Sequence, residues 1–261
     1  MAIHSSDSPE SPEGSYALAY GNRTGRGPGR TVRTLRWILP GVRRVWGQVG
    51  PYADAWSARN ASELAQPGRR LIVLGDSMAQ AVGGSAPEAG WVDRVADDLR
   101  SAGHDPRIVN LSATGARVPD LLAQQLPVME ALPDPDSAEP VGVRDGDLVV
   151  VLIGSNDLYA GRQHRDRLPG AFAEMLERLP RGTVVSTLIQ PHGEAGQVNA
   201  MLWRAAREGS VRVVDMGGEG PSSWVGKTAA DFFHPNDKGY AAIAQAFSPH
   251  VLRAWEASSP A

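Results

Sequence analysis

Three side chains in this sequence have the types and spacing needed to activate a hydroxyl group. A serine hydroxyl attacks a carbonyl carbon when a base removes its proton, and that base is most often a histidine held by a carboxylate. Ser77 follows a short apolar run, and Asp231 and His234 stand three residues apart, directly before the last helical pattern. We therefore predict Ser77 as the nucleophile, His234 as the base and Asp231 as the residue that fixes the imidazole tautomer.

Such chemistry also needs hydrogen-bond donors for the oxygen that becomes negatively charged in the transition state. We expect three donors: the backbone N–H of Ser77, the backbone N–H of Gly115 and the side-chain amide of Asn156. A glycine suits the second position because the backbone must come close to the substrate. An amide suits the third position because it donates without adding charge.

These residues lie far apart in the sequence, and a parallel sheet would bring them together. Five short runs rich in Val, Ile and Leu, the composition of strands that are buried on both faces, alternate with helical patterns. The runs span residues 71–74, 108–111, 148–153, 184–189 and 211–214. This alternation predicts a doubly wound α/β fold with helices on both faces of the sheet. Ligands of such folds bind beyond the carboxyl ends of the strands, where the candidate residues fall.

Four short blocks in this order resemble the SGNH hydrolases, also called the GDSL family. The blocks are Gly75-Asp76-Ser77, Gly115, Gly154-x-Asn156-Asp157 and Asp231-x-x-His234-Pro235. The resemblance covers about residues 70–255 and implies a flavodoxin-like three-layer α/β/α fold with a five-stranded parallel sheet. It also implies hydrolysis of esters or thioesters through an acyl-serine, with oxyanion donors from Ser77, Gly115 and Asn156. In the family pattern, Asp76 braces the loop by hydrogen bonds and takes no part in the chemistry.

Composition divides the chain into four parts. Residues 1–30 are rich in Ser, Pro, Gly and Arg, and we expect a disordered tail. Residues 31–67 form a basic helical arm, which Pro40-Gly41 should break or kink. Residues 68–256 form the hydrolase domain, and residues 257–261 form a C-terminal tail. The apolar stripe of residues 31–56 has two interpretations: it packs on its own domain, which we favour, or it anchors the chain to a membrane surface or an anionic partner.

The composition also limits the classes of function. The chain has no cysteine, which excludes disulfides, thiolate catalysis and cysteine-ligated metals. The remaining histidines are scattered, and no glycine-rich dinucleotide fingerprint follows a strand, so we predict no metal and no cofactor. We expect no nucleic-acid partner. The chain has no apolar run of membrane-spanning length and no signal-peptide pattern at its N-terminus, so we expect a cytoplasmic protein.

Together these features predict a serine hydrolase that acts on a small-molecule carboxylic ester or thioester with a short acyl or acetyl group. We expect the pocket walls to come from residues 80–90, 158–168 and 217–230, with Trp224 in contact with the substrate. Two alternatives stay open. One is a catalytically idle binding module on the same fold, and the other is a lysophospholipid or long-chain lipase that uses the N-terminal arm at a membrane surface.

Overall fold

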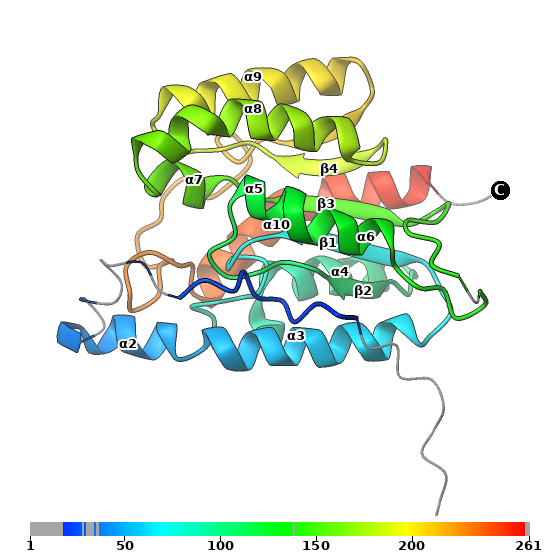
Figure 1. Ribbon diagram of the computed structural model, residues 1–261, viewed down its shortest axis with the longest axis horizontal. Helices are drawn as coiled ribbons and strands as arrows, with labels where there is room; N and C mark the ends of the chain where they lie inside the picture. The colour runs from blue at the N-terminus through cyan, green and yellow to red at the C-terminus, as the bar shows by residue number, and fades with distance from the viewer. Residues whose placement is uncertain (1–17, 28, 30–33, 35–36, 138, 259–261) are drawn as a thin grey trace, which may run out of the picture.

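The computed structural model describes residues 18–27, 29, 34, 37–137 and 139–258, and a parallel sheet of five strands lies at the centre of this part (Figure 1). The strands are β1 (Arg70–Gly75), β2 (Arg107–Asn110), β3 (Leu148–Leu152), β4 (Thr183–Ser186) and β5 (Val211–Val214). Their order across the sheet is β2-β1-β3-β4-β5, which is the flavodoxin-like order. The predicted α/β fold with a five-stranded parallel sheet is confirmed.

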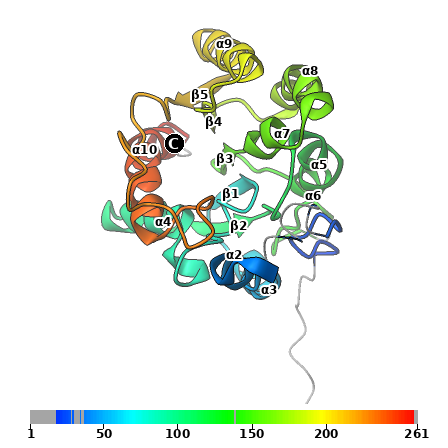
Figure 2. The same cartoon turned by 90° about the vertical axis from the view of Figure 1, so that its left-hand side faces the viewer.

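Helices cover both faces of this sheet (Figure 2). The α-helices in the described residues are α2 (Pro40–Trp46), α3 (Val49–Leu64), α4 (Trp91–Ser101), α5 (Val118–Asp120), α6 (Leu126–Glu130), α7 (Ser155–Tyr159), α8 (Arg162–Arg178), α9 (Gly193–Arg207) and α10 (Asp237–Ala257). Two further helical turns are the 3₁₀ helix η1 (Pro87–Ala89) and the π-helix η2 (Leu121–Gln125). Side chains alternate along β1, so that Leu71 and Val73 pack with α4 and α10, whereas Ile72 and Leu74 pack with α5, α6, α8 and α9.

The winding of the sheet reverses at β1. The chain passes from β1 to β2 on one side and then returns across β1 to β3 on the other. The carboxyl ends of β1 and β3 therefore flank the switch point, where open α/β sheets form their ligand crevices. Gly75 ends β1 opposite Leu152 of β3, and a Cβ atom at Gly75 would lie 2.5 Å from the carbonyl oxygen of Leu152. A glycine is thus required for the two strand ends to lie this close.

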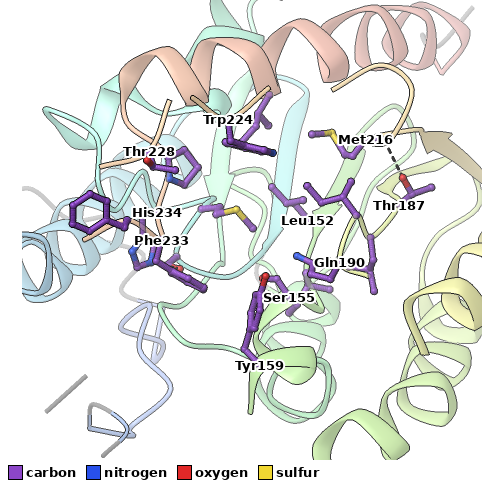
Figure 3. Close-up of a pocket in the computed structure, with 18 of the residues that line it drawn as sticks. Leu152, Ser155, Tyr159, Thr187, Gln190, Met216, Trp224, Thr228, Phe233 and His234 are labelled. Carbon is purple, nitrogen blue, oxygen red and sulfur yellow. Dashed lines mark hydrogen bonds between the residues drawn. The ribbon is translucent and has the colours of Figure 1, made fainter. Parts of the chain in front are cut away.

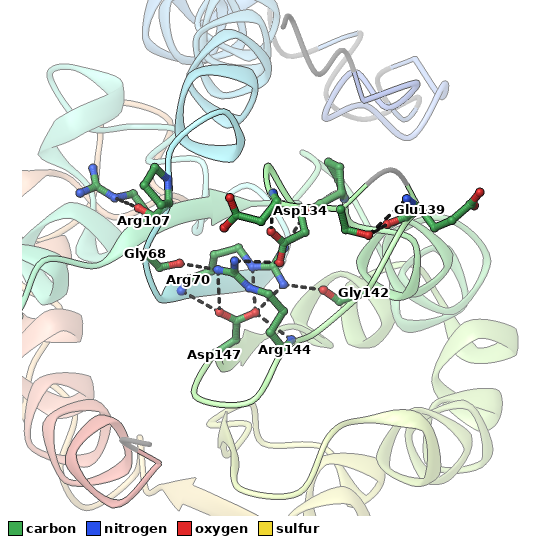
Figure 4. A network of polar contacts seen from close by, with 12 residues as sticks. Gly68, Arg70, Arg107, Asp134, Glu139, Gly142, Arg144 and Asp147 are labelled. Carbon is green, nitrogen blue, oxygen red and sulfur yellow. Dashed lines mark hydrogen bonds and ion pairs between the residues drawn. The ribbon is translucent and has the colours of Figure 1, made fainter. Parts of the chain in front are cut away.

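A buried ion pair holds the other ends of the same two strands (Figure 4). Arg70 at the start of β1 donates from Nε to Oδ2 of Asp147, just before β3, at 2.8 Å. Its remaining nitrogens donate to the carbonyl oxygens of Pro133 at 3.0 Å and Gly142 at 2.5 Å. Burying two charges is costly unless their polar atoms are satisfied. Here every guanidinium nitrogen has an acceptor, so the pair fixes β1 against β3 at the end away from the candidate site.

The helical arm packs on the domain through α2 and α3. Val42 and Val45 of α2 are buried, as are Tyr52 and Trp56 of α3, so this part of the stripe has the packing that we favoured. Ile38 and Leu39 of the stripe are exposed, and residues 28, 30–33, 35 and 36 lie outside the described part of the chain. The predicted break is present: Trp37 and Ile38 are helical, Leu39 is not, and a new helix begins at Pro40. Pro40 occupies the first position of α2, where its missing N–H has no intrahelical partner to lose. No helix within the described ranges is long and apolar enough to cross a membrane.

The predicted disorder of residues 1–30 is wrong for residues 18–27, which we call the N-terminal strap; residues 1–17 lie outside the described part of the chain. Composition predicts disorder when a segment has little apolar surface to bury. The strap is held instead by hydrogen bonds. Asn22 is fully buried and donates from Nδ2 to the carbonyl oxygens of Asn110 and Ser112, at 2.7 and 2.9 Å. The hydroxyl of Tyr20 donates to Leu111 at 2.8 Å.

Replacing Asn22 tests whether the strap is part of the folded domain. Asn22→Ala removes the side-chain donor to two buried carbonyl groups and the acceptor of the Asn60 amide. Asn60 and Gln80 still donate to the two carbonyl groups, so the cost is that of the lost hydrogen bonds, about 0.5–1.5 kcal/mol each. Urea unfolding should therefore show a loss of about 1–3 kcal/mol. Arg23→Ala is the control, because its ion pair with Asp54 is exposed and should contribute less than about 1 kcal/mol. Equal stability of Asn22→Ala and the parent chain would contradict a docked strap.

Candidate active site

The structure brings the three predicted triad residues into hydrogen-bonding contact. Ser77 lies in the loop after β1, and Asp231 and His234 lie in the turn before α10. Nε2 of His234 is 2.9 Å from Oγ of Ser77, and its Nδ1 is 2.6 Å from Oδ2 of Asp231. The other carboxylate oxygen of Asp231 accepts the backbone N–H groups of Phe233 and His234, both at 3.1 Å. These two bonds hold the three-residue spacing in the turn.

The charge on Asp231 decides how the histidine is oriented. Burial by itself raises the pKa of Asp231, but the hydrogen bond and charge of His234 and the two backbone donors outweigh it, and the net pKa lies below the ordinary value. The residue is therefore a carboxylate at neutral pH. A carboxylate beside Nδ1 favours the tautomer with its proton on that nitrogen. This leaves the lone pair of Nε2 facing the Ser77 hydroxyl, as a base requires.

Gly83 allows the serine loop to touch the histidine turn. It has a φ of +98°, and a Cβ atom there would lie 2.5 Å from the carbonyl oxygen of Pro235 and 2.8 Å from Cβ of His234. Gln48, at the junction of α2 and α3, accepts the N–H of Gly83 at 2.8 Å and donates to the carbonyl of Gly84 at 2.9 Å. The helical arm therefore braces the loop that carries Ser77.

Gln125 holds the last residue of β1 from the opposite side. Its buried side chain accepts the N–H of Gly75 at 2.9 Å and donates to the carbonyl of the same residue at 2.8 Å. Gln125 ends the π-helix η2, an element that is frequent at functional sites. Both backbone groups of Gly75 are thus satisfied two residues before Ser77, which leaves the serine on a rigid base.

The three predicted oxyanion donors differ in their present partners. In the part of the chain that the structure describes, no protein acceptor takes the backbone N–H of Ser77 or of Gly115. The side-chain amide of Asn156 donates to the carbonyl of Ala116 at 2.9 Å and to Oδ2 of Asp76 at 3.2 Å. The two backbone groups are therefore unoccupied donors, whereas Asn156 must exchange one of its two acceptors to serve a substrate oxygen.

Two buried carboxyl groups support these loops. Asp76 is 1% exposed and accepts hydrogen bonds from the N–H of Met78, the hydroxyl of Ser155 and the amide of Asn156. Asp157 accepts the N–H of Val118 at 3.0 Å, which fixes the start of α5. Burial raises the pKa of each to about 6, although hydrogen bonds from the neighbours lower it in part. Asp76 thus has the contacts of a bracing residue, as the family resemblance implies.

A pocket of about 310 Å³ opens beside Ser77 and His234 (Figure 3). Most of its walls are apolar, and Trp224 is among them, as expected. The other lining residues are Met78, Leu152, Ile153, Ser155, Tyr159, Thr187, Leu188, Ile189, Gln190, Pro191, Met216, Thr228, Phe232, Phe233, Pro235 and Ile243. In the described residues, no group of three or more His, Asp or Glu side chains is arranged to hold a metal ion.

The walls differ in part from the sequence prediction. No residue of 80–90 lines the pocket, because Gln48 and Tyr52 hold the Gly83–Gly84 part of this loop against the arm. The range 158–168 contributes only Tyr159. Residues 188–191, after β4, and the two phenylalanines beside His234 form walls that the sequence analysis missed. The available signal in the sequence was the apolar character of these residues, which lie in or next to loops that follow strands.

Comparison with known proteins gives a family match and two similar folds. The sequence matches the GDSL-like lipase/acylhydrolase family over residues 73–242, well over half of the chain. The crystal structure of TesA is 22% identical, with a TM-score of 0.53 over 71% of this chain and 99% of that chain. A family 3 carbohydrate esterase from Clostridium thermocellum is 17% identical, with a TM-score of 0.56 over 73% of this chain and 99% of that chain. At these identities, the likeness shows the fold alone. No curated protein sequence matches this chain.

The raised pKa of Asp157 predicts a dependence of stability on pH. The unfolded carboxyl releases its proton near pH 4, whereas the folded one keeps it to about pH 6, so this group stabilises the fold less as the pH rises through that window. Asp157→Asn cannot titrate and keeps an acceptor for the N–H of Val118. The free energy of unfolding of Asp157→Asn minus that of the parent chain should therefore rise by about 2 kcal/mol from about pH 4 to about pH 7. Asp166→Asn, at an exposed carboxylate on α8, is the control for urea titrations at both pH values. A difference from the parent chain that stays constant with pH would contradict the assignment.

Proposed function

We propose that this chain, which belongs to the GDSL-like lipase/acylhydrolase (SGNH hydrolase) family of ester-hydrolysing enzymes, cleaves a carboxylic ester or thioester through an acyl-serine on Ser77. The observation that carries the proposal is the hydrogen-bonded series from Ser77 through His234 to Asp231, beside an apolar pocket. The two unoccupied backbone N–H groups support it further. An intact set of nucleophile, base, orienting carboxylate and donors favours a working enzyme over an idle binding module.

The proposed reaction follows from the positions of these groups. Oγ of Ser77 forms a bond to the acyl carbon while its proton moves to Nε2 of His234, and the carbonyl oxygen becomes the oxyanion. The N–H groups of Ser77 and Gly115 and the amide of Asn156 donate to that oxygen. His234 then protonates the departing alcohol or thiol, and the acyl group stays on Ser77. A water molecule attacks next while His234 takes its proton; the acyl–serine bond then breaks, His234 returns the proton to Oγ of Ser77, and the acid is released.

The pocket favours an acyl chain longer than the short group expected from the sequence. Its volume of about 310 Å³ has room for about ten groups of the size of a water molecule, and a methylene group is of similar size. An acetyl group needs far less space. The apolar walls, Trp224 included, would gain free energy by removing a hydrocarbon chain from water. A series of p-nitrophenyl esters from acetyl to dodecanoyl tests this: kcat/KM should rise beyond acetyl and fall once the chain exceeds the pocket.

Replacing the nucleophile tests the proposed function directly. Ser77→Ala should lower the hydrolysis of activated esters by a factor on the order of 10⁴–10⁶, because Ser77 is the pocket hydroxyl that is hydrogen-bonded to His234 in the described residues. The melting temperature should stay close to that of the parent chain, since the side chain lost is small. A fluorophosphonate probe should label the parent chain at Ser77 and leave the variant unlabelled. Wild-type activity in the purified variant would refute the assignment.

Replacing Asn156 tests its role at the oxyanion. Asn156→Ala should lower kcat by roughly 10²–10³ with a smaller effect on KM, because an oxyanion donor acts mainly in the transition state. The variant also loses the bonds to Ala116 and Asp76, so its free energy of unfolding must be measured in parallel. A loss of stability with an unchanged kcat would make Asn156 a loop-bracing residue only.

A further inference from the structure

The N-terminal strap runs along the loop that carries Gly115, although it lies outside the matched family region. Successive strap residues contact successive loop residues: Tyr20 and Asn22 bond to residues 110–112, Arg23 pairs with Thr114 in a β-bridge, and Arg26 reaches Gly115. The strap is drawn in dark blue beside α3 in Figure 1. The sequence predicted no role for these residues, because their composition resembles a solvated tail.

Arg26 makes the contact nearest to the proposed oxyanion donor. Its Nη2 donates to the carbonyl oxygen of Gly115 at 2.8 Å and to Oδ2 of Asp120 at 2.5 Å, and its Nη1 bonds to the other oxygen of Asp120. The hydrogen bond to Asp120 raises the pKa of Arg26, so the guanidinium is charged. A planar guanidinium that binds a carboxylate with two parallel bonds is held in one orientation. The Gly115 carbonyl is therefore bound to a fixed group.

Gly115 needs such a restraint. Its φ is +75°, and a Cβ atom at this position would have no neighbour within 4 Å, so packing does not fix its backbone. On one side, the side chain of Gln80 accepts the N–H and hydroxyl of Thr114, at 3.0 and 2.6 Å. On the other side, Arg26 holds the carbonyl oxygen of Gly115, and the N–H of Ala116 in the same peptide bond donates to Ala113 at 2.9 Å. Gly115 is not among the residues that line the pocket, and a glycine without these restraints can change the direction of its N–H.

We propose that Arg26 is a positioning residue that fixes the direction of the Gly115 N–H for the oxyanion. The proposal rests on the function proposed above, since it assigns Arg26 to that same site. Catalytic donors act only when they are held close to the productive geometry. Removing a donor outright typically lowers kcat by about 10²–10³, and loosening one should have a smaller effect, of about tenfold.

Three variants of the full chain test this proposal. Arg26→Ala should lower kcat for a p-nitrophenyl ester by about tenfold, with KM within about twofold of that of the parent chain. Arg26→Lys keeps the charge but loses the planar, two-pronged guanidinium, so its kcat should lie between those of Arg26→Ala and the parent chain. Arg23→Ala is the matched control on the same strap, because its side chain bonds to Gly21, Gly50 and Asp54 and not to Gly115. It should leave kcat unchanged.

Hydrogen exchange separates this proposal from the proposed function. In Arg26→Ala, the amides of Thr114 and Ala116, which are hydrogen-bonded in the parent chain, should exchange faster, and in Arg23→Ala they should not. An unchanged kcat in Arg26→Ala, an equal fall of kcat in both alanine variants, or unchanged exchange would each overturn the positioning role. Absence of ester hydrolysis in the parent chain would refute the proposed function, and the exchange measurement would still decide whether Arg26 orders the loop.

A separate observation concerns the surface around the pocket. Of the ten exposed large apolar side chains in the described residues, eight belong to the pocket entrance or to the segment beside it. Four line the pocket: Tyr159, Ile189, Phe232 and Phe233. Val225 follows Trp224, and Trp37, Ile38 and Leu39 precede α2. Gly41 at the start of α2 packs against Ala230, next to Asp231, which brings this segment to the same end of the domain. We call these eight residues the apolar rim.

Positive charge lies beside the apolar rim. Arg43 and Arg44 of α2 are exposed, and neither has an ion pair with a described carboxylate. Between residues 14 and 53 the sequence has seven arginines and no Asp or Glu. Exposed aromatic and aliphatic side chains next to unpaired arginines are the combination that binds the interface of a membrane with anionic lipids.

We infer that the apolar rim docks on an anionic lipid surface, with the pocket opening toward the lipid. The rim and the pocket are continuous, since Phe232 and Phe233 belong to both. An acyl ester could then enter the pocket from the bilayer without passing through water. The docking itself depends only on the rim and the arginines, and the delivery of substrate rests on the proposed function.

Vesicle binding tests the docking surface. The full chain should sediment with vesicles of phosphatidylcholine and phosphatidylglycerol, and less with phosphatidylcholine alone or in high salt. Trp37→Ser/Ile38→Ser and Arg43→Glu/Arg44→Glu should each weaken binding at least about tenfold, while hydrolysis of soluble p-nitrophenyl acetate stays unchanged, since none of these residues lines the pocket. Val141→Ser/Trp203→Ser, at the two exposed apolar residues outside the rim, is the matched control.

The outcomes separate lipid from other partners. Binding that is lost in the rim and charge variants but kept in the control supports the inference. Absence of binding by the parent chain, equal loss in the control, or binding that ignores lipid charge would overturn it. The inference would also be overturned if the parent chain associated with itself in the absence of vesicles and the Trp37→Ser/Ile38→Ser variant did not, because a second copy of the chain would then cover the rim.

Discussion

The hydrogen bond between Ser77 and His234 joins positions 157 residues apart, and most of the described structure serves to make it possible. It requires the loop after the first strand to touch the turn before the last helix. Gly83 permits that contact because a side chain there would strike the histidine turn. The parallel sheet supplies the frame, since the strand order places the end of β1 at the switch point. The buried Arg70–Asp147 pair fixes β1 against β3 at the opposite end.

Elements outside the matched family region support the loops of the site. Gln48 and Tyr52 of the arm hold Gly83 and Gly84 in the serine loop, and the strap holds the loop that carries Gly115. These contacts are largely hydrogen bonds between buried amide and carbonyl groups. They stabilise one arrangement of the loops when every group has a partner, and removing one partner destabilises the fold. The strap and the arm helices α2 and α3 are therefore coupled to the geometry of the site as well as to the stability of the domain.

The site divides into a rigid polar wall and an apolar wall. Asp76, Gln125 and the strand ends hold the polar side in place through hydrogen bonds of 2.9–3.1 Å, which suits groups that must meet a transition state. The apolar side includes the loops after β4 and β5 together with the end of β3, and several of its side chains are exposed at the entrance. Loops of this kind vary without disturbing the sheet. The division explains how one frame fixes the chemistry and leaves the choice of acyl chain to its loops.

The sequence by itself determined the α/β class and the five strands, and it singled out Ser77, His234, Asp231, Gly115 and Asn156 as candidates, because apolar periodicity and short motifs are local properties of the chain. Only the tertiary structure decided which loops line the pocket, that residues 18–27 are ordered, and that Arg26 meets Gly115. Composition measures how much apolar surface a segment can bury, and it does not register side-chain hydrogen bonds to carbonyl groups almost ninety positions away. Such partners exist only after the sheet has formed. Their effects on order and position therefore belong to the fold rather than to any stretch of sequence.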